Sequence, residues 1–239
     1  MFDSTQMYRL ISFLFIIIPV QSFGQRWING DDLLWTRYLV SWNLSNRYTW
    51  VQELDNRMTT SLDRRVQTIY HSHLRRAFGS SHEGAIGLSL SHVQRPLANE
   101  TVDIPEVRLF EEWIHRIPLH KNGLFHSRIR LDQRFFLPSE ATELAIIPPF
   151  QFRFRYQAQY RLLLPKNFVW RISNEWMGHT PAAFVFDQNR LASSIEIPVS
   201  PQMAIEAGYI WLLSRGRTQV SSIDVFRLTL HHRIHKKKA

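Results

Sequence analysis

The chain has 239 residues and a mass of 28.4 kDa, with 44% hydrophobic residues, 21% charged residues and no cysteine. Its length and its aromatic content of 13% exclude a disordered chain, and the absence of cysteine excludes disulfide frameworks, thiol catalysis and cysteine-ligated metals. The net charge is +9, and 24 of the 29 basic residues are arginine, which suits paired and partly desolvated sites.

The first residues have the pattern of a secretory signal peptide. Arg9 supplies a positive charge, Leu10–Val20 is a short apolar run, and Ser22 and Gly24 are small residues just before a cleavage site at Gln25. The apolar run is shorter than the ~20 residues that a membrane helix needs. We therefore expect an exported protein, with an uncleaved N-terminal anchor as the alternative.

The rest of the chain alternates between apolar and polar residues with a period of two. In Phe150–Leu163 the aromatic residues occupy one face and the Gln and Arg residues the other, and Leu124–Phe136 repeats this pattern. A helix would scatter these residues around its axis, whereas a strand places each set on one face. By this alternation we place about eleven strands, each near the ~10 residues of a tilted membrane strand.

The number of strands has to be inferred. Because bacterial single-chain barrels usually have an even number of strands, we predict twelve, with ten as the alternative and Gln25–Asp32 as the candidate for the additional strand. The connections alternate between tight turns and longer polar links, as in an outer-membrane barrel. The turns are predicted at Ser45–Asn46, His120–Gly123, Pro165–Asn167 and Ser200–Gln202, and the links at Met58–Arg64, Pro96–Pro105, Leu137–Pro149 and Thr180–Gln188.

Alternation alone does not say whether the apolar face points inward or toward lipid. The strands are long, the polar face is rich in arginine and carboxylates, and several tryptophans (Trp35, Trp170, Trp176 and Trp211) lie near strand ends, as in aromatic girdles. We therefore predict an all-β, antiparallel up-and-down transmembrane β-barrel in the bacterial outer membrane, with outer-membrane lipid as its partner. The predicted division is a signal peptide over 1–24, the barrel over 25–235 and a basic tail over 236–239.

Short motifs along this region resemble a known family. They are Leu34-Trp35 before Glu53, Asp55 and Arg57, then HSRIRLDQRFF (126–136), FRFRYQAQYRLLLP (152–165), NEW (174–176), FDQNRL (186–191) and EAGYIW (206–211). In this order they resemble the uncharacterised bacterial outer-membrane β-barrel family catalogued as a domain of unknown function (DUF 2490). The resemblance implies one barrel domain and supplies no reaction. The chain departs from the usual barrel pattern at its end, where His231, His232 and Arg233 replace a terminal aromatic residue.

The polar face yields the candidate site. The residues predicted to line the lumen and to bind small anions are Arg128, Arg130, Asp132, Arg134, Arg153, Arg155 and Arg161. Their predicted charge partners are Glu53, Asp55, Arg57, Glu112, Arg171, Glu175, Arg190, Glu196 and Glu206. Such a wall could form a narrow pore for anions, or arginines and carboxylates could neutralise each other in a structural barrel with a filled interior.

Other chemistry has weaker support. His71 and His73 share a strand face but have no recognisable third ligand, so we expect no metal and no cofactor. A lipid- or surface-modifying enzyme remains an alternative, with Ser80, Ser81, His82 and Glu83 as candidates at a short turn, and so does a soluble periplasmic ligand-binding barrel. We expect no nucleic-acid partner, because arginines and aromatic residues occupy opposite faces.

Overall fold

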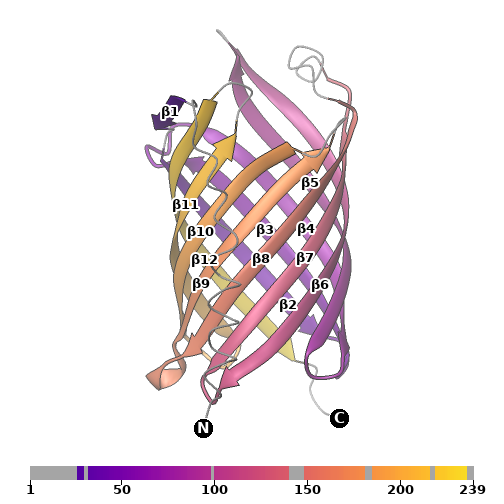
Figure 1. Ribbon diagram of the computed structural model, residues 1–239, viewed down its shortest axis with the longest axis vertical. Helices are drawn as coiled ribbons and strands as arrows, with labels where there is room; N and C mark the ends of the chain where they lie inside the picture. The colour runs from indigo at the N-terminus through magenta and orange to yellow at the C-terminus, as the bar shows by residue number, and fades with distance from the viewer. Residues whose placement is uncertain are drawn as a thin grey trace.

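The computed structural model describes residues 26–29, 32–97, 100–139, 148–180, 185–215 and 219–235, which form a closed β-barrel (Figure 1). The predicted signal peptide and basic tail lie outside the described residues. No helix in the described part of the chain is long and apolar enough to cross a membrane.

The described chain is almost entirely strand. The strands are β1 (Arg26–Asn29), β2 (Leu33–Asn43), β3 (Tyr48–Thr59), β4 (Arg65–Phe78), β5 (His82–Leu97), β6 (Glu100–His120), β7 (Gly123–Phe136), β8 (Phe150–Leu163), β9 (Val169–Thr180), β10 (Val185–Pro198), β11 (Met203–Arg215) and β12 (Gln219–His235). A short 3-10 turn, η1 (Pro165–Asn167), joins β8 to β9. The two strands expected most clearly from alternation correspond to β7 and β8.

The barrel closes through a parallel pair of strands. From β2 to β12 each strand pairs antiparallel with the next, and β12 then pairs with β2 in parallel, from Val225 opposite Leu33 to His235 opposite Asn43. The wall therefore has eleven strands, β2 to β12, and the predictions of twelve or ten strands, and of a fully antiparallel barrel, were wrong. An odd number of strands joined by hairpins leaves the first and last strands pointing the same way.

The expected additional strand exists only as β1. It pairs in parallel with Gln219–Ser222 of β12, on the same edge that β2 occupies further along. Because β1 and β2 follow one another along that edge, β1 adds no position to the wall.

The two ends of the barrel differ. Five tight connections lie at one end, here called the short-turn end, and β12 also finishes there. The other end carries the longer connections, and the hairpin of β5 and β6 rises above it (Figure 1). The link predicted at Pro96–Pro105 was wrong, because β5 continues to Leu97 and β6 begins at Glu100. Ile104 in this hairpin packs against Phe136.

The closed sheet separates an inner from an outer face. Alternate residues of the strands from β2 to β12 point into the barrel, and many of them are buried there. Trp35 was expected in an outer aromatic girdle, but it is only 4% exposed and faces inward. It packs in a small apolar cluster with Leu33, Ile210 and Val225, because it shares the strand face of Arg37 and not that of Tyr38.

Candidate functional site: the charged barrel interior

The residues predicted to line the lumen, six arginines and Asp132, all come from two paired strands. Arg128, Arg130, Asp132 and Arg134 project inward from β7, and Arg153, Arg155 and Arg161 project inward from β8. The register places Arg130 opposite Arg155 and Asp132 opposite Arg153. Alternation on two adjacent strands therefore produces a dense cationic wall, and its charge has to be compensated from other strands.

Glu106 is the most enclosed of the compensating groups. Its carboxylate side chain is 0% exposed and accepts two hydrogen bonds of 2.6 Å from Arg108 on the same strand. Arg134 of β7 also binds both of its oxygens, with one contact at 3.1 Å. One carboxylate thus holds two guanidinium groups in the charge-assisted, bidentate geometry that is strongest for this pair.

A second network crosses the middle of the barrel. Glu175 of β9 accepts hydrogen bonds from Arg155 at 2.7 Å and from Arg128 at 2.6 Å. Asp132, which is 0% exposed, accepts one from Arg130 at 2.7 Å. Glu112 lies 3.4 Å from Arg128. These contacts join β6, β7, β8 and β9 across the inner surface.

A third network lines β2 and β3. Arg37 binds both oxygens of Asp55 at 2.6 and 2.9 Å and lies 3.3 Å from Glu53. The guanidinium of Arg57 sits 3.9 Å from the ring centroid of Trp35, and that of Arg190 on β10 is 5.2 Å from the same centroid. Since β10 is three strands away from β2 around the wall, Trp35 bridges the interior.

A fourth network joins β9 to β12. Glu206 accepts hydrogen bonds from Arg171 at 3.2 Å and Arg227 at 2.9 Å, and contacts His231 at 3.0 Å. Glu196 accepts from Arg171 and from Arg233, each at 2.5 Å. Glu196, Glu206 and His231 are close enough to hold a metal ion, but the guanidinium groups already bind the carboxylate oxygens that the ion would need. The arrangement is therefore better described as an ion-pair network.

Most of the barrel matches a known protein family. The family model described as "Protein of unknown function (DUF2490)" matches residues 33–221, from the start of β2 into β12. The chain belongs to the DUF2490 family. The resemblance inferred from the sequence is thereby confirmed. No curated protein matches the chain.

Sequence reasoning missed several interior residues of this DUF2490 barrel. They are Arg37, Arg75, Glu83, Glu106, Arg108, Arg116, Asp187, Arg227, His231 and Arg233. Most of them lie on the polar face of an alternating segment, so the same signal could have found them. Asp187 is different, because it lies where the pairing of β10 with β9 shifts register, and a bulge of this kind interrupts the alternation.

The interior of the DUF2490 barrel holds more arginines than carboxylates among the described residues. The inward arginines are Arg37, Arg57, Arg75, Arg108, Arg116, Arg128, Arg130, Arg134, Arg153, Arg155, Arg161, Arg171, Arg190, Arg227 and Arg233. The inward carboxylates are Glu53, Asp55, Glu83, Glu106, Glu112, Asp132, Glu175, Asp187, Glu196 and Glu206. The interior is therefore a network of ion pairs with a cationic excess.

The histidine candidates have contacts of their own on the two faces of the wall. His71 bonds to Ser89, and His73 accepts a hydrogen bond from Arg75 at 2.9 Å, so both are ordinary members of the inner lining. His82 stacks on His115 with ring centroids 4.4 Å apart on the outer face. The neighbouring Glu83 points inward to Arg116. His82 and Glu83, two of the four residues considered for an enzyme, thus point to opposite faces of β5.

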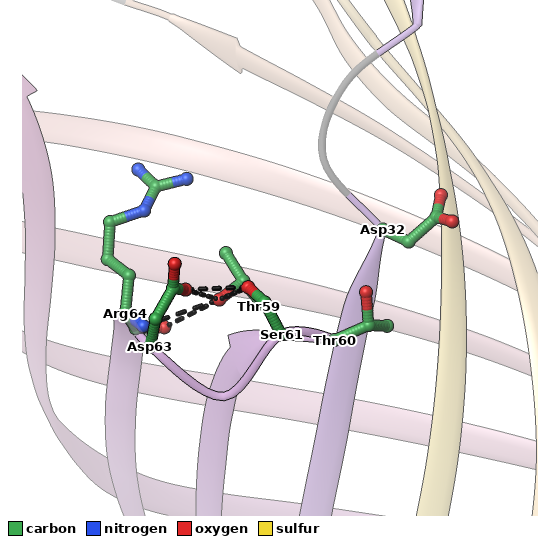
Figure 2. Close-up of a pocket in the computed structure, with 6 residues that line it drawn as sticks. All are labelled: Asp32, Thr59, Thr60, Ser61, Asp63 and Arg64. Carbon is green, nitrogen blue, oxygen red and sulfur yellow. Dashed lines mark hydrogen bonds between the residues drawn. The ribbon is translucent and has the colours of Figure 1, made fainter.

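A small pocket lies in the β3–β4 loop, at the end of the barrel opposite the short-turn end (Figure 2). Thr59 and Ser61 each donate a hydrogen bond of 2.6 Å to the same carboxylate oxygen of Asp63. These two hydroxyl groups favour the ionised carboxylate and hold the pKa of Asp63 below its ordinary value. The backbone N–H of Thr60 donates to the carbonyl of Asp32 at 2.9 Å. The polar groups of this loop satisfy one another, and the loop is a structural turn.

Proposed function

We propose that this DUF2490 protein is a structural β-barrel of the bacterial outer membrane, non-enzymatic, delivered there by a cleaved signal peptide. The outer face supports the membrane location. It exposes large apolar side chains on every strand from β2 to β12, for example Leu54, Leu90, Ile129, Ile172 and Phe226. A soluble barrel would place such residues inside, whereas a membrane barrel presents them to lipid.

The borders of this apolar surface support the same proposal. Near the short-turn end, the outer face carries an arginine and four histidines, which are Arg76, His82, His115, His120 and His232. Tyr38 and Tyr160 bond to His232 and His120 there, both at 2.9 Å. Amphipathic aromatic side chains of this kind favour the interface between membrane and water. Short turns face the periplasm in outer-membrane barrels, which gives the orientation.

The filled interior carries the proposal of a structural role. Carboxylates in the lumen such as Glu106 and Asp132 have side chains that are 0% exposed. Contacts between strands that are not neighbours, such as Trp35 with Arg190, join inner side chains across the barrel. A wide, water-filled channel would leave these groups accessible. The cationic excess favours a second candidate, a narrow anion-selective pore.

Membrane fractionation tests the location. We expect the protein in the outer-membrane fraction, resistant to carbonate and released by detergent, with heat-modifiable migration on a gel. Recovery in the soluble periplasm would contradict the proposal and favour a soluble barrel. A comparison of lipid A profiles with and without the gene tests the enzymatic alternative, and an unchanged profile is expected.

Planar-bilayer recording separates the two candidate roles. We expect no steady conductance from the purified barrel, because ion pairs between inner side chains, such as Arg128 with Glu175, favour a filled lumen. Anion-selective conductance that disappears when a lumen arginine is replaced would establish the pore instead. The outcome does not affect the fractionation test, which depends only on the outer face.

A further inference from the structure

Five inward residues near the short-turn end form a patch of hydrogen-bond donors on four adjacent strands. Arg116 of β6 lies opposite His126 of β7, which lies opposite Gln159 of β8. Arg161 of β8 lies directly opposite Arg171 of β9. We call these five residues the donor patch. Each lies close to the point where its strand enters a tight connection.

The carboxylates near the donor patch do not reach all of it. Arg116 binds Glu83 at 3.0 Å, and Arg171 binds Glu196 at 2.5 Å. Arg161 has no ion pair within the described ranges. Its Nε atom and the Nε2 atom of His126 are buried and have no hydrogen-bond partner there. The lack of an ion pair distinguishes Arg161 from the other arginines of the predicted wall on β7 and β8, each of which is paired with a carboxylate.

This arrangement is unfavourable without a further negative charge. Like charges directly opposite each other on neighbouring strands destabilise a sheet, and Arg161 and Arg171 are placed in this way. A buried donor without a partner costs additional free energy. His126 also lies within the electrostatic reach of Arg116, Arg161 and Arg171. An anion bound among these groups would relieve both costs.

We propose that the donor patch is a binding site for a small oxyanion, a phosphate or carboxylate group, held chiefly by Arg161. A guanidinium group presents paired N–H donors that match the oxygens of these anions. Arg161 is half-buried and close to the end of β8, so the anion enters from the short-turn end. The donor patch lies on one side of the inner face, and binding there needs no conduction. It rests on the barrel fold and on the inner lining of the proposed function, not on the membrane location.

Phosphate binding to the purified protein tests this site. The mature protein in detergent is titrated with inorganic phosphate by isothermal calorimetry, in wild-type form and as Arg161→Gln and Arg76→Gln. Arg76 is the matched control, because it lies at the same end of the barrel but packs on the outside against Tyr48 and Phe78. We expect Arg76→Gln to bind as wild type and Arg161→Gln to bind about 10- to 100-fold more weakly, as for loss of a charged hydrogen bond.

Two outcomes would overturn the proposal. One is the absence of saturable phosphate binding by the wild-type protein, and the other is equal affinity in wild type and Arg161→Gln. Sulfate and acetate are used as competitors to distinguish a tetrahedral from a planar anion. Displacement by vesicles of anionic phospholipid would identify a lipid headgroup as the source of the phosphate.

A second measurement needs no variant. A ligand that binds only the folded state raises the thermal midpoint. We expect a higher unfolding temperature for the wild-type protein in phosphate than in chloride at equal ionic strength. Equal midpoints at phosphate concentrations that saturate other protein phosphate sites would count against the donor patch, while leaving the fractionation result of the proposed function untouched.

Discussion

Arg108 holds Glu106 through two hydrogen bonds of 2.6 Å, although the two residues are only two positions apart on β6. Both side chains point inward because alternate residues of a strand share a face. The carboxylate is completely enclosed, and Arg134 approaches it from the neighbouring strand. Removing the negative charge would leave two guanidinium groups buried without a carboxylate partner.

We therefore predict that Glu106→Gln strongly destabilises the barrel. Breaking a buried ion pair by removing one partner costs about 3–5 kcal/mol, because the remaining charge is not compensated. The measurement is the free energy of unfolding in denaturant, with the protein in detergent micelles or lipid vesicles. Glu111→Gln is the matched control, since Glu111 lies on the outer face of the same strand and accepts a hydrogen bond from Gln133 at 3.2 Å. Equal stability of the two variants would show that the interior ion pairs are not needed for closure.

A glycine packed closely against two side chains predicts a second effect on stability. Gly87 lies on the inner face of β5, between His73 and Phe110. A Cβ atom there would lie 2.4 Å from the Cβ of His73 and 2.5 Å from the ring of Phe110. The ring of Phe110 also carries the guanidinium of Arg130 at 3.6 Å, so it has little freedom to move.

We expect Gly87→Ala to lower the free energy of unfolding by about 1–3 kcal/mol, the usual cost of overpacking. Gly84→Ala on the outer face of the same strand is the control. A Cβ atom at Gly84 would lie 3.1 Å from the ring of Phe78, which can turn outward. Thermal unfolding followed by heat-modifiable migration gives both midpoints. A larger loss in Gly84→Ala would contradict the inward assignment of Gly87.

The sequence was sufficient to predict a barrel and the contents of its two faces. Strict alternation in β7 and β8 places Arg128 and Arg155 on one face whatever the packing around them. Alternation is weaker where the chain is interrupted. Asp187 lies at a bulge. Trp35 shares the inward face of Arg37, but its aromatic ring and its place near a strand end led to the wrong expectation of an outer girdle.

The closure of the barrel could not be predicted in the same way. The pairing of β12 with β2 joins residues nearly two hundred positions apart, from Val225 with Leu33 onward, and nothing local in either segment specifies it. The usual even number of strands then favoured twelve, although the alternation itself indicated about eleven. Which carboxylate pairs with which arginine was also beyond the sequence, because the pairing depends on which strands meet across the interior.

The β3–β4 loop gives a prediction that depends on pH. Because the hydroxyls of Thr59 and Ser61 bind its ionised form, the pKa of Asp63 lies below its value in the unfolded chain. Their stabilising contribution is therefore complete above the unfolded pKa of about 3.9 and is lost as pH falls through the folded pKa. We expect Ser61→Ala to raise the pKa of Asp63 toward the ordinary value. Carboxyl ¹³C chemical shifts measured against pH would show this, and an unchanged titration curve would argue against the two hydrogen bonds.

The parallel closure predicts a specific pattern of cross-links. The sequence contains no cysteine, so any disulfide within the chain must join the two introduced cysteines. Thr36 and Leu228 are partners in the register of β2 and β12, and both face outward. We expect Thr36→Cys with Leu228→Cys to form a disulfide under mild oxidation, because partner residues of adjacent strands have Cα atoms within the range that a disulfide spans.

A pair displaced along the same strand is the control for that cross-link. Thr36→Cys with Ile234→Cys joins residues six positions out of register, since Ile234 is the partner of Trp42. At roughly 3.3 Å per residue the two cysteines would be about 20 Å apart, too far for a disulfide. Non-reducing gel migration after oxidation separates the outcomes. Cross-linking of the displaced pair and not of the matched pair would exclude the parallel register and, with it, the eleven-stranded wall.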